Sequence, residues 1–346
     1  MFKYGVVIGR FQPVHLGHLY MIRQALSRCH KVLIMIGSAY RAPTVKNPFC
    51  FDDRQQLIQA CLQQIDASYL DRVKILPLED QMYNESKWIN TVRSIVSQYC
   101  QQPEQVALVA HDKDASTYYL AHFPEWQFVA LDNYHDISAT PVRDAWFVGE
   151  LWQNRIWIEQ LPQQTIAFLQ SFEQTEEYQR LRREFDCIKR YQQEWSGTPY
   201  PSIFTTTDAI VVCDNHILLV RRKYPPGQYL LALPGGFLEA NEWIQQGLLR
   251  ELKEETSIEL SDQLLMDSLA TIRVFDHPGR SQIGRVITHA GYFDLKQQIL
   301  PAVQAADDAL EAIWYPLAEQ TVLKEQMHDD HYYILAKMLS DSFESP

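Results

Sequence analysis

The fold of the N-terminal half is decided by the stretch YGVVIGRFQPVHLGH, residues 4–18. It starts with an apolar, β-branched run that ends at Gly9, which is typical of a short buried strand. Apolar residues then recur at helical spacing over residues 18–29, and residues 31–37 form a second apolar run. A strand, a glycine turn, a helix and a second strand in this order predict a βαβ unit, and therefore a parallel sheet.

The same alternation of strands and helices continues along the N-terminal half. Further strands are predicted at residues 73–76, 106–109 and 128–131, and further helices at residues 53–64 and 88–99. This pattern predicts a doubly wound, Rossmann-like α/β domain. A Gln-, Glu- and Arg-rich stretch with helical spacing, residues 162–195, is predicted to close the domain.

The character of the chain changes after the segment SGTPYP, residues 196–201, which is the predicted linker because a glycine and two prolines punctuate it. Beyond it, strands are predicted at residues 205–213, 216–221, 269–274 and 286–293, and only two clear helices, at residues 242–256 and 328–340. We therefore predict two domains, residues 1–195 and 202–346, the second being α+β with a mixed sheet.

The composition limits the kinds of function to consider. The chain has 346 residues, enough for two cores, and its 46% apolar and 21% charged residues are ordinary for a soluble protein. Its net charge of −12 argues against a nucleic-acid partner, which would need clustered Lys and Arg. Six cysteines without a Cys-x-x-Cys pair suggest neither zinc nor disulfides. Because no signal peptide or long apolar stretch is apparent, a cytoplasmic protein without a membrane segment is expected.

A first candidate site follows the first predicted strand. His15 and His18 are three residues apart at the start of a helix, so their rings can point the same way. The helix N-terminus favours a phosphate, and Gly9 and Gly17 allow the backbone to approach it closely. An isolated pair of this kind is more often a cap or a surface feature.

A second segment strengthens the phosphate interpretation. The stretch ISATPVR, residues 137–143, follows the last predicted strand of the sheet and can open a helix. It supplies hydroxyls from Ser138 and Thr140 and a cation from Arg143. Both segments follow strand ends, where open α/β sheets bind their ligands.

These two segments resemble the H-x-G-H and I-S-x-T-x-x-R fingerprints of the nucleotidyltransferase superfamily. Together with GSA, residues 37–39, and NPF, residues 47–49, they are similar to the archaeal-type nicotinamide mononucleotide (NMN) adenylyltransferases. The resemblance implies that His15, His18 and Arg143 are catalytic. It also implies contacts to ATP and its phosphates by Gly9, Arg10, Phe11, Lys46, Ser138, Thr140 and Arg143.

The same resemblance implies a nicotinamide nucleotide pocket formed by Asp80, Asn84 and Trp88. Trp88 could stack on the pyridinium ring, although a core position is equally compatible with the sequence. The implied reaction is attack of the NMN phosphate on the α-phosphorus of ATP, which gives NAD and pyrophosphate with Mg²⁺ bridging the phosphates. A different acceptor, such as a phosphopantetheine-like compound, stays open.

A second candidate site lies in the C-terminal half. Glu251, Glu254 and Glu255 fall at positions i, i+3 and i+4 of one predicted helix, so their carboxylates share a face. Such a cluster alone is usually a solvated surface, but here Gly236 and Arg250 precede it at fixed spacing.

These positions resemble the Nudix box, G-x5-E-x7-R-E-U-x-E-E-x-G-U, in which U is aliphatic. The matching residues are Gly236, Glu242, Arg250, Glu251, Leu252, Glu254, Glu255 and Ile258. The resemblance implies that Glu251, Glu254 and Glu255 are catalytic and hold Mg²⁺ or Mn²⁺, whereas Arg250 orients them with Glu242 as its partner. The box's final glycine is replaced by Ser257, at a position where the chain turns off the helix.

The substrate of this second site is less constrained. Residues 275–280 and 284–287 resemble the corresponding stretch of ADP-ribose-cleaving Nudix enzymes, which predicts hydrolysis of ADP-ribose to AMP and ribose 5-phosphate. The usual Asp-Pro-Arg is absent, because residues 281–283 are Ser-Gln-Ile. A ligand-sensing or differently specific Nudix domain is the alternative. Asp307, Asp308 and Glu311 are candidates for the catalytic base or simply a solvated acidic loop.

The two resemblances together cover nearly the whole chain and are those of bifunctional NMN adenylyltransferase/Nudix proteins. The chain is accordingly expected to act on ATP, NMN, NAD and ADP-ribose in the cytoplasm. The oligomeric state is left open by the sequence, with a homo-oligomer as one possibility.

Overall fold

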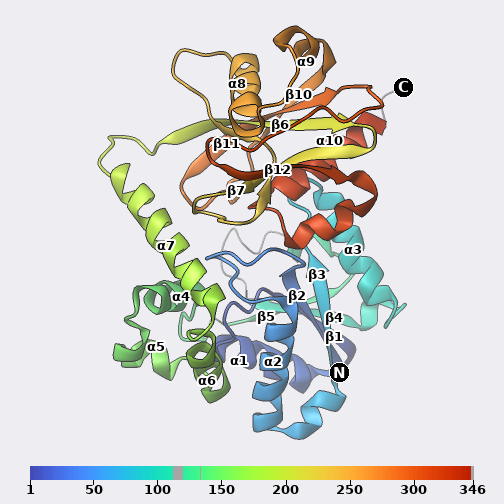
Figure 1. Ribbon diagram of the computed structural model, residues 1–346. Helices are drawn as coiled ribbons and strands as arrows, with labels where there is room; N and C mark the ends of the chain where they lie inside the picture. Colours follow the sequence, from blue (N-terminus) through green and yellow to red (C-terminus); the bar gives the residue numbers. More distant parts are fainter. Residues whose placement is uncertain (112–119, 133, 344–346) are drawn as a thin grey trace. The chain divides into compact units, whose positions relative to one another are not determined.

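The computed structural model describes residues 1–111, 120–132 and 134–343 (Figure 1). The chain divides into two compact units, Met1–Gln179 and Arg180–Pro346. The division falls within helix α7 (Glu176–Glu194), and residues 195–202 are neither helix nor strand. The boundary at residues 196–201 therefore stays a prediction.

The first unit is built on a parallel sheet of five strands in the order β3-β2-β1-β4-β5. The strands are β1 (Phe2–Gly9), β2 (Cys29–Ala39), β3 (Val73–Glu79), β4 (Val106–His111) and β5 (Gln127–Leu131). The predicted Rossmann-like fold is confirmed. The order reverses between β1 and β4, and in open α/β sheets ligands bind at such a reversal, beyond the carboxyl ends of the strands.

Helices cover both faces of this sheet, which is why its central strands are continuously apolar. Neighbouring residues of one strand serve opposite faces: Val7 packs in a core with α1 (Leu16–Arg28) and α2 (Phe51–Ile65), whereas Val6 packs in a core with α3 (Glu85–Ser97). Further helices among the described residues are α4 (Ala139–Val148), α5 (Arg155–Glu159), α6 (Gln163–Phe172) and α7, and 3₁₀ turns include Ala67–Asp71, Pro103–Gln105 and Leu151–Gln153.

The second unit contains a mixed sheet of seven strands in the order β10-β11-β6-β7-β12, with β8 paired to β7 and β9 paired to β6. Its strands are β6 (Ile203–Cys213), β7 (His216–Arg222), β8 (Leu231–Ala232), β9 (Gly235–Phe237), β10 (Leu269–Phe275), β11 (Arg285–Asp294) and β12 (Ala309–Pro316). The pairing of β11 with β6 is parallel and the other pairings are antiparallel, so the predicted mixed sheet is confirmed.

The helices of this unit are α8 (Ile244–Thr256), α9 (Asp262–Ser268) and α10 (His331–Phe343), with a 3₁₀ segment at Leu317–Glu325. On α8, Leu248 and Leu252 belong to one core cluster with Val211 of β6 and Phe293 of β11. Two expectations were wrong: α9 is an additional helix, and α10 begins at His331 rather than at residue 328. A helix of seven residues shows too few repeats for its periodicity to be recognised. Within the described residues, we find no helix that is both long and apolar enough to cross a bilayer.

Candidate functional sites

The two histidines of the first site lie together at the start of α1. His15 is the N-cap residue, and its backbone N–H donates to His18 Nδ1 at 3.3 Å. Their rings stack with centroids 3.6 Å apart, and the His18 ring also contacts the Phe11 ring at 4.7 Å. Because His18 Nδ1 accepts a hydrogen bond, the neutral ring carries its proton on Nε2, which can donate to a phosphate oxygen.

The two fingerprint segments of the first unit meet at Gly17. A Cβ atom added there would lie 3.1 Å from the His15 ring and 3.7 Å from the Cβ of Ile137, which begins the second segment. A Cβ would press on the His15 ring and make an ordinary contact with Ile137, so glycine suits the close approach of the ring. The histidines and the start of α4 therefore belong to one site, although 120 residues separate Gly17 from Ile137.

Arg143 on α4 connects the second segment to the loop after β1. Its Nη1 donates to the carbonyl of Gln12 at 2.7 Å, and its Nη2 donates to Thr140 Oγ1 at 3.3 Å. Burial, together with the charge of Arg10, lowers the pKa of Arg143 to about 10. Ser138 is the N-cap residue of α4, and both hydroxyls of the segment are exposed. The segment thus presents an N-terminus, two hydroxyls and a cation.

The turn after β1 packs closely against Gly9, the last residue of that strand. Phe11 is buried with a φ of 54°, and a Cβ at Gly9 would lie 3.1 Å from its ring. Arg10 is exposed, and its Cγ lies 3.7 Å from where a Cβ of Gly37 would be. Lys46 is half-buried on the loop after β2. The direct contacts of these residues to ATP stay predictions.

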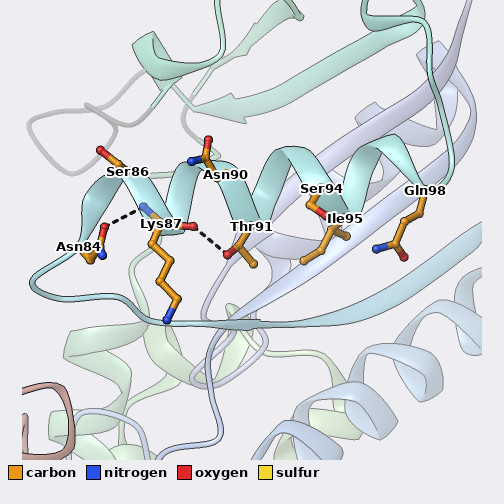
Figure 2. A pocket seen from close by; sticks show the side chains of 8 residues that line it. All are labelled: Asn84, Ser86, Lys87, Asn90, Thr91, Ser94, Ile95 and Gln98. Carbon is orange, nitrogen blue, oxygen red and sulfur yellow. Dashed lines mark hydrogen bonds between the residues drawn. The ribbon is translucent and has the colours of Figure 1, made fainter. Parts of the chain in front are cut away.

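The three predicted nicotinamide contacts have different environments. Asp80 accepts hydrogen bonds from the Ser38 backbone N–H and from Arg41 Nη1, both at 3.2 Å. Figure 2 shows Asn84 at the start of α3, where its Oδ1 accepts from the Lys87 backbone N–H at 3.0 Å and so caps the helix. Trp88 packs against the core on that face of the sheet. Their roles toward a nucleotide stay predictions.

Sequence reasoning missed Arg54, which is 1% exposed on α2. Its guanidinium donates to four backbone carbonyls, those of Arg10 (2.8 Å), Gly37 (2.7 Å), Ser38 (3.2 Å) and Cys50 (3.0 Å). Burial lowers its pKa to about 10. Arg54 therefore holds the turn after β1 and the end of β2 in one arrangement, a role that nothing in the local sequence indicates.

The acidic cluster of the second unit is organised by Arg250 on α8. Its Nε and Nη2 donate to the two carboxylate oxygens of Glu242, at 3.0 and 2.6 Å, which is the predicted pair. Its Nη1 donates to Glu251 at 2.8 Å and to Glu254 at 3.0 Å. These bonds lower the pKa of Glu242 and raise that of Arg250. One guanidinium thus orients three carboxylates.

Glu255 differs from the other glutamates because it is buried. Burial raises its pKa to about 8, with the charge of Glu251 adding to the effect, while the Gly235 backbone N–H donates to its Oε2 at 3.0 Å. A Cβ at Gly236 would lie 2.6 Å from Glu251 Oε1. Gly235 and Gly236, expected in a tight turn, belong to strand β9, which therefore lies directly against the carboxylates.

These carboxylates line a pocket of about 570 Å³ within the second unit. Asp307 and Asp308 also line it, whereas Glu311 is not among the described lining residues and pairs with Arg221 at 2.9 Å. Arg280, from the predicted stretch 275–280, also lines the pocket. It is buried and donates through Nε and Nη2 to Asp330 at 3.0 and 3.1 Å, a pairing that the sequence did not predict. This pair joins two segments that are 50 residues apart.

The donor set of the pocket fits a divalent cation that prefers oxygen ligands. Desolvation raises the pKa of buried Glu255 and of half-buried Glu251, and a bound cation would favour their charged forms. Among the described residues, no three acidic, His or Cys side chains already converge as ligands. Glu251 and Glu254 instead accept hydrogen bonds from Arg250.

Ser257, which replaces the box glycine, ends α8 in the left-handed conformation, with φ 43° and ψ 36°. We expect Ser257→Gly to stabilise the second unit by about 1 kcal/mol, because an L-residue with a Cβ is strained there. That corresponds to an increase of about 2–4 °C in the unfolding temperature of a unit of this size. Calorimetry of the two proteins would measure it. Ser257→Ala is the control and should give no increase, since alanine keeps the strain.

Comparisons with known proteins match both units. The cytidylyltransferase-like family model matches residues 6–145, and the NUDIX domain model matches residues 204–338. An Acinetobacter baylyi nicotinamide/nicotinic acid mononucleotide adenylyltransferase is 37% identical over 185 residues, 53% of this chain and 94% of that protein. A crystal structure of a bifunctional NMN adenylyltransferase/ADP ribose pyrophosphatase from Francisella tularensis has a TM-score of 0.92 and 39% identity, with 99% of each chain covered.

The chain belongs to the bifunctional NMN adenylyltransferase/ADP-ribose pyrophosphatase family. A second structure of the Francisella tularensis protein, complexed with AMP and a manganese ion, covers 99% of each chain at 38% identity and a TM-score of 0.90. The likeness to these structures extends over both units, because 99% of the chain is covered. The similarity to these structures and the observed order of the strands both confirm the fold that was predicted for each half.

Proposed function

We propose that the chain is a bifunctional enzyme of NAD metabolism. Its first site would transfer the adenylyl group of ATP to NMN, and its second would hydrolyse ADP-ribose to AMP and ribose 5-phosphate. The observation that carries the proposal is the likeness to the Francisella tularensis bifunctional protein over 99% of the chain. Both constellations of side chains that the two reactions require are also present in the same molecule.

At the first site, a phosphate oxygen of NMN attacks the α-phosphorus of ATP, and the bond to the departing pyrophosphate breaks. Charge develops on the phosphoryl oxygens, so catalysis rests on alignment and neutralisation. His18 would donate from Nε2 and His15 lies stacked beside it. Arg10 and Arg143 would neutralise the leaving group, and Ser138 and Thr140 would bind its oxygens.

At the second site, a water attacks a phosphorus of the diphosphate, the P–O–P bond breaks, and the leaving phosphate takes a proton. Glu251, Glu254 and Glu255 would hold Mg²⁺ or Mn²⁺, which lowers the pKa of a water and offsets the charge of a diphosphate. Arg250 positions the glutamates. Asp307 and Asp308 are better placed than Glu311 to accept the proton of the water, because they line the pocket.

The retained carboxylates favour hydrolysis over a purely ligand-sensing second unit. We further propose that the substrates are small nucleotides rather than nucleic acid, in keeping with a net charge of −12. Cytoplasmic location and a homo-oligomeric state stay predictions.

The test is direct. The purified protein is incubated with Mg²⁺, ATP and NMN, and separately with Mg²⁺ and a panel of nucleoside diphosphate compounds that includes ADP-ribose. Chromatography of the products should show NAD in the first mixture and AMP with ribose 5-phosphate in the second. Absence of NAD, or cleavage of other diphosphates but not of ADP-ribose, would refute the corresponding half of the proposal.

Arg54 gives a further prediction for the first reaction. We expect Arg54→Lys to lower kcat for NAD formation on the order of 10²-fold. Lysine keeps the charge but cannot donate to all four carbonyls, and a small misplacement of the reacting groups can lower a rate by about that factor. Arg23→Lys, an exposed change on α1, is the matched control. Initial rates at saturating ATP and NMN would measure the effect. An unchanged kcat would show that the turn holds its geometry without Arg54.

A further inference from the structure

A second group of charged and polar side chains, distinct from the glutamates, lines the pocket beside α8. Asp208 of β6, Arg280, Asp330 and His331 all line it, and each is at most 9% exposed. The Arg280 guanidinium, which binds both carboxylate oxygens of Asp330, also lies 3.8 Å from Asp208 Oδ2. Charges that leave water cost free energy, and removing one partner of a buried pair leaves the other uncompensated. This buried cluster therefore ties together the segments that carry its members.

His331 connects the buried cluster to the segment that precedes β9. Its Nδ1 accepts a hydrogen bond from the Leu233 backbone N–H at 3.0 Å, across 98 residues of sequence. Because Nδ1 is the acceptor, the neutral ring carries its proton on Nε2, which lies 4.0 Å from Asp208 Oδ1. Burial lowers the pKa of His331, so the ring stays neutral and keeps this acceptor.

The segment that His331 contacts leads directly to the glutamates. Two residues beyond Leu233, the Gly235 backbone N–H donates to Glu255 Oε2 at 3.0 Å. A Cβ at Gly235 would lie 2.7 Å from Asp208 Oδ1, so the Asp208 side chain packs closely against the start of β9. The Gly235 N–H, and with it the Glu255 carboxylate, is therefore placed by side chains of the buried cluster.

The start of α10 sets where the His331 ring lies. Asp330 directly precedes this helix, and its backbone carbonyl accepts from two N–H groups of the first turn, at 2.8 and 3.0 Å. Its carboxylate accepts two N–H groups of Arg280, a bidentate geometry that fixes both direction and distance. On β6, Asp208 also accepts from Thr288 Oγ1 of β11 at 2.5 Å. Arg280 thus ties the helix start, and His331 with it, to the sheet.

We propose that His331 is a positioning residue that sets the Glu255 carboxylate for a divalent cation. It acts through the backbone from Leu233 to Gly235, and the bidentate bonds of Arg280 keep it in place. The inference rests on the function proposed for the second site. Loss of a group that supports a metal ligand typically costs 10–100-fold in metal affinity or activity. The effect of His331 is therefore expected already in cation binding, before any substrate is present.

The test compares two substitutions that differ in one acceptor. In His331→Asn the side-chain oxygen stands as many bonds from Cβ as Nδ1 does and can accept the Leu233 N–H, whereas His331→Leu has no acceptor. Mn²⁺ alone is titrated into the full chain, and the unbound ion is followed by its electron paramagnetic resonance signal. We expect the dissociation constant of Mn²⁺ to rise about tenfold or more in His331→Leu and to stay close to its original value in His331→Asn.

Two further variants make this titration specific. Glu255→Gln shows how much Mn²⁺ binds elsewhere on the chain. His216→Leu is the matched control, because this half-buried histidine of β7 is not among the described residues that line the pocket. It should bind Mn²⁺ as the unaltered chain does. An unchanged dissociation constant in His331→Leu would overturn the positioning role.

Hydrolysis of ADP-ribose gives a second readout. At saturating Mg²⁺, positioning predicts a lower kcat with an unchanged KM in His331→Leu, and a kcat that recovers in His331→Asn. Equal losses in both variants would overturn the proposal, because the ring itself would then be required. Weaker Mn²⁺ binding by His331→Leu in a chain that does not cleave ADP-ribose would support the positioning and refute the proposed hydrolysis instead.

Arg280→Lys replaces His331→Leu if the latter does not fold. Lysine keeps the charge but gives up the bidentate geometry toward Asp330. Mn²⁺ binding without substrate should again weaken, and this loss could not come from a contact between Arg280 and a substrate. Unchanged Mn²⁺ binding in a folded Arg280→Lys protein would overturn the proposal.

Discussion

Glu254→Gln combined with Glu255→Gln is expected to abolish ADP-ribose hydrolysis while NAD formation continues at its original rate. Loss of partners that merely support metal ligands typically costs 10–100-fold, so removal of two ligands should cost more than about 100-fold. Both side chains belong to α8, which lies wholly in the second unit. Product chromatography of the two reactions, run on one preparation, would measure both rates.

The double substitution is not expected to unfold the protein, so misfolding would not explain a loss of hydrolysis. Burial raises the pKa of Glu255 to about 8, so at neutral pH its carboxyl is largely protonated without a cation and resembles a glutamine. The Gln oxygen can still accept the hydrogen bond that the Gly235 N–H donates. Glu254 is exposed. Glu259→Gln, a change of the same kind on the exposed residue just beyond α8, should leave both activities intact. If both activities fell together, or if neither fell, the two-site interpretation would be wrong.

The sheets and the acidic cluster could be predicted because their signals are local. The apolar runs of β1 and β2, the helical periodicity of α1 and the spacing from Gly236 to Glu255 all lie within short stretches of sequence. The pair formed by Glu242 and Arg250 followed from the same stretch. Such features need no knowledge of the rest of the fold.

What the sequence did not reveal depends on contacts between distant segments. Arg54 acts on carbonyls up to 44 residues away, and Arg280 pairs with Asp330 across 50 residues. Arg54 belongs to no motif, and the stretch 275–280 that contains Arg280 gives no sign of its partner. The strands β8 and β9, of two and three residues, are shorter than any recognisable alternation and exist because longer strands pair with them.

His18→Ala is expected to have the converse effect to the glutamate substitutions. Loss of one hydrogen-bond donor to charge that develops in a transition state typically costs 10²–10³-fold in kcat, and we expect NAD formation to fall by about that factor. Hydrolysis of ADP-ribose should not change. Initial rates at saturating ATP and NMN would measure the first effect. His30→Ala, which removes an exposed histidine from β2, is the matched control.

The expected loss is too large to arise from the damage that the substitution does to α1. His18 Nδ1 accepts the His15 backbone N–H at the helix start, so its removal also removes a capping contact. Capping contacts contribute typically about 1 kcal/mol, whereas a folded protein has a reserve of roughly 5–15 kcal/mol. Nearly all molecules would stay folded, and kcat per folded molecule would report the chemistry alone. A variant that kept its kcat while its unfolding temperature fell would show that His18 is only a cap. Stabilisation of the charge that develops on the phosphates would then have to rest on His15 and Arg143.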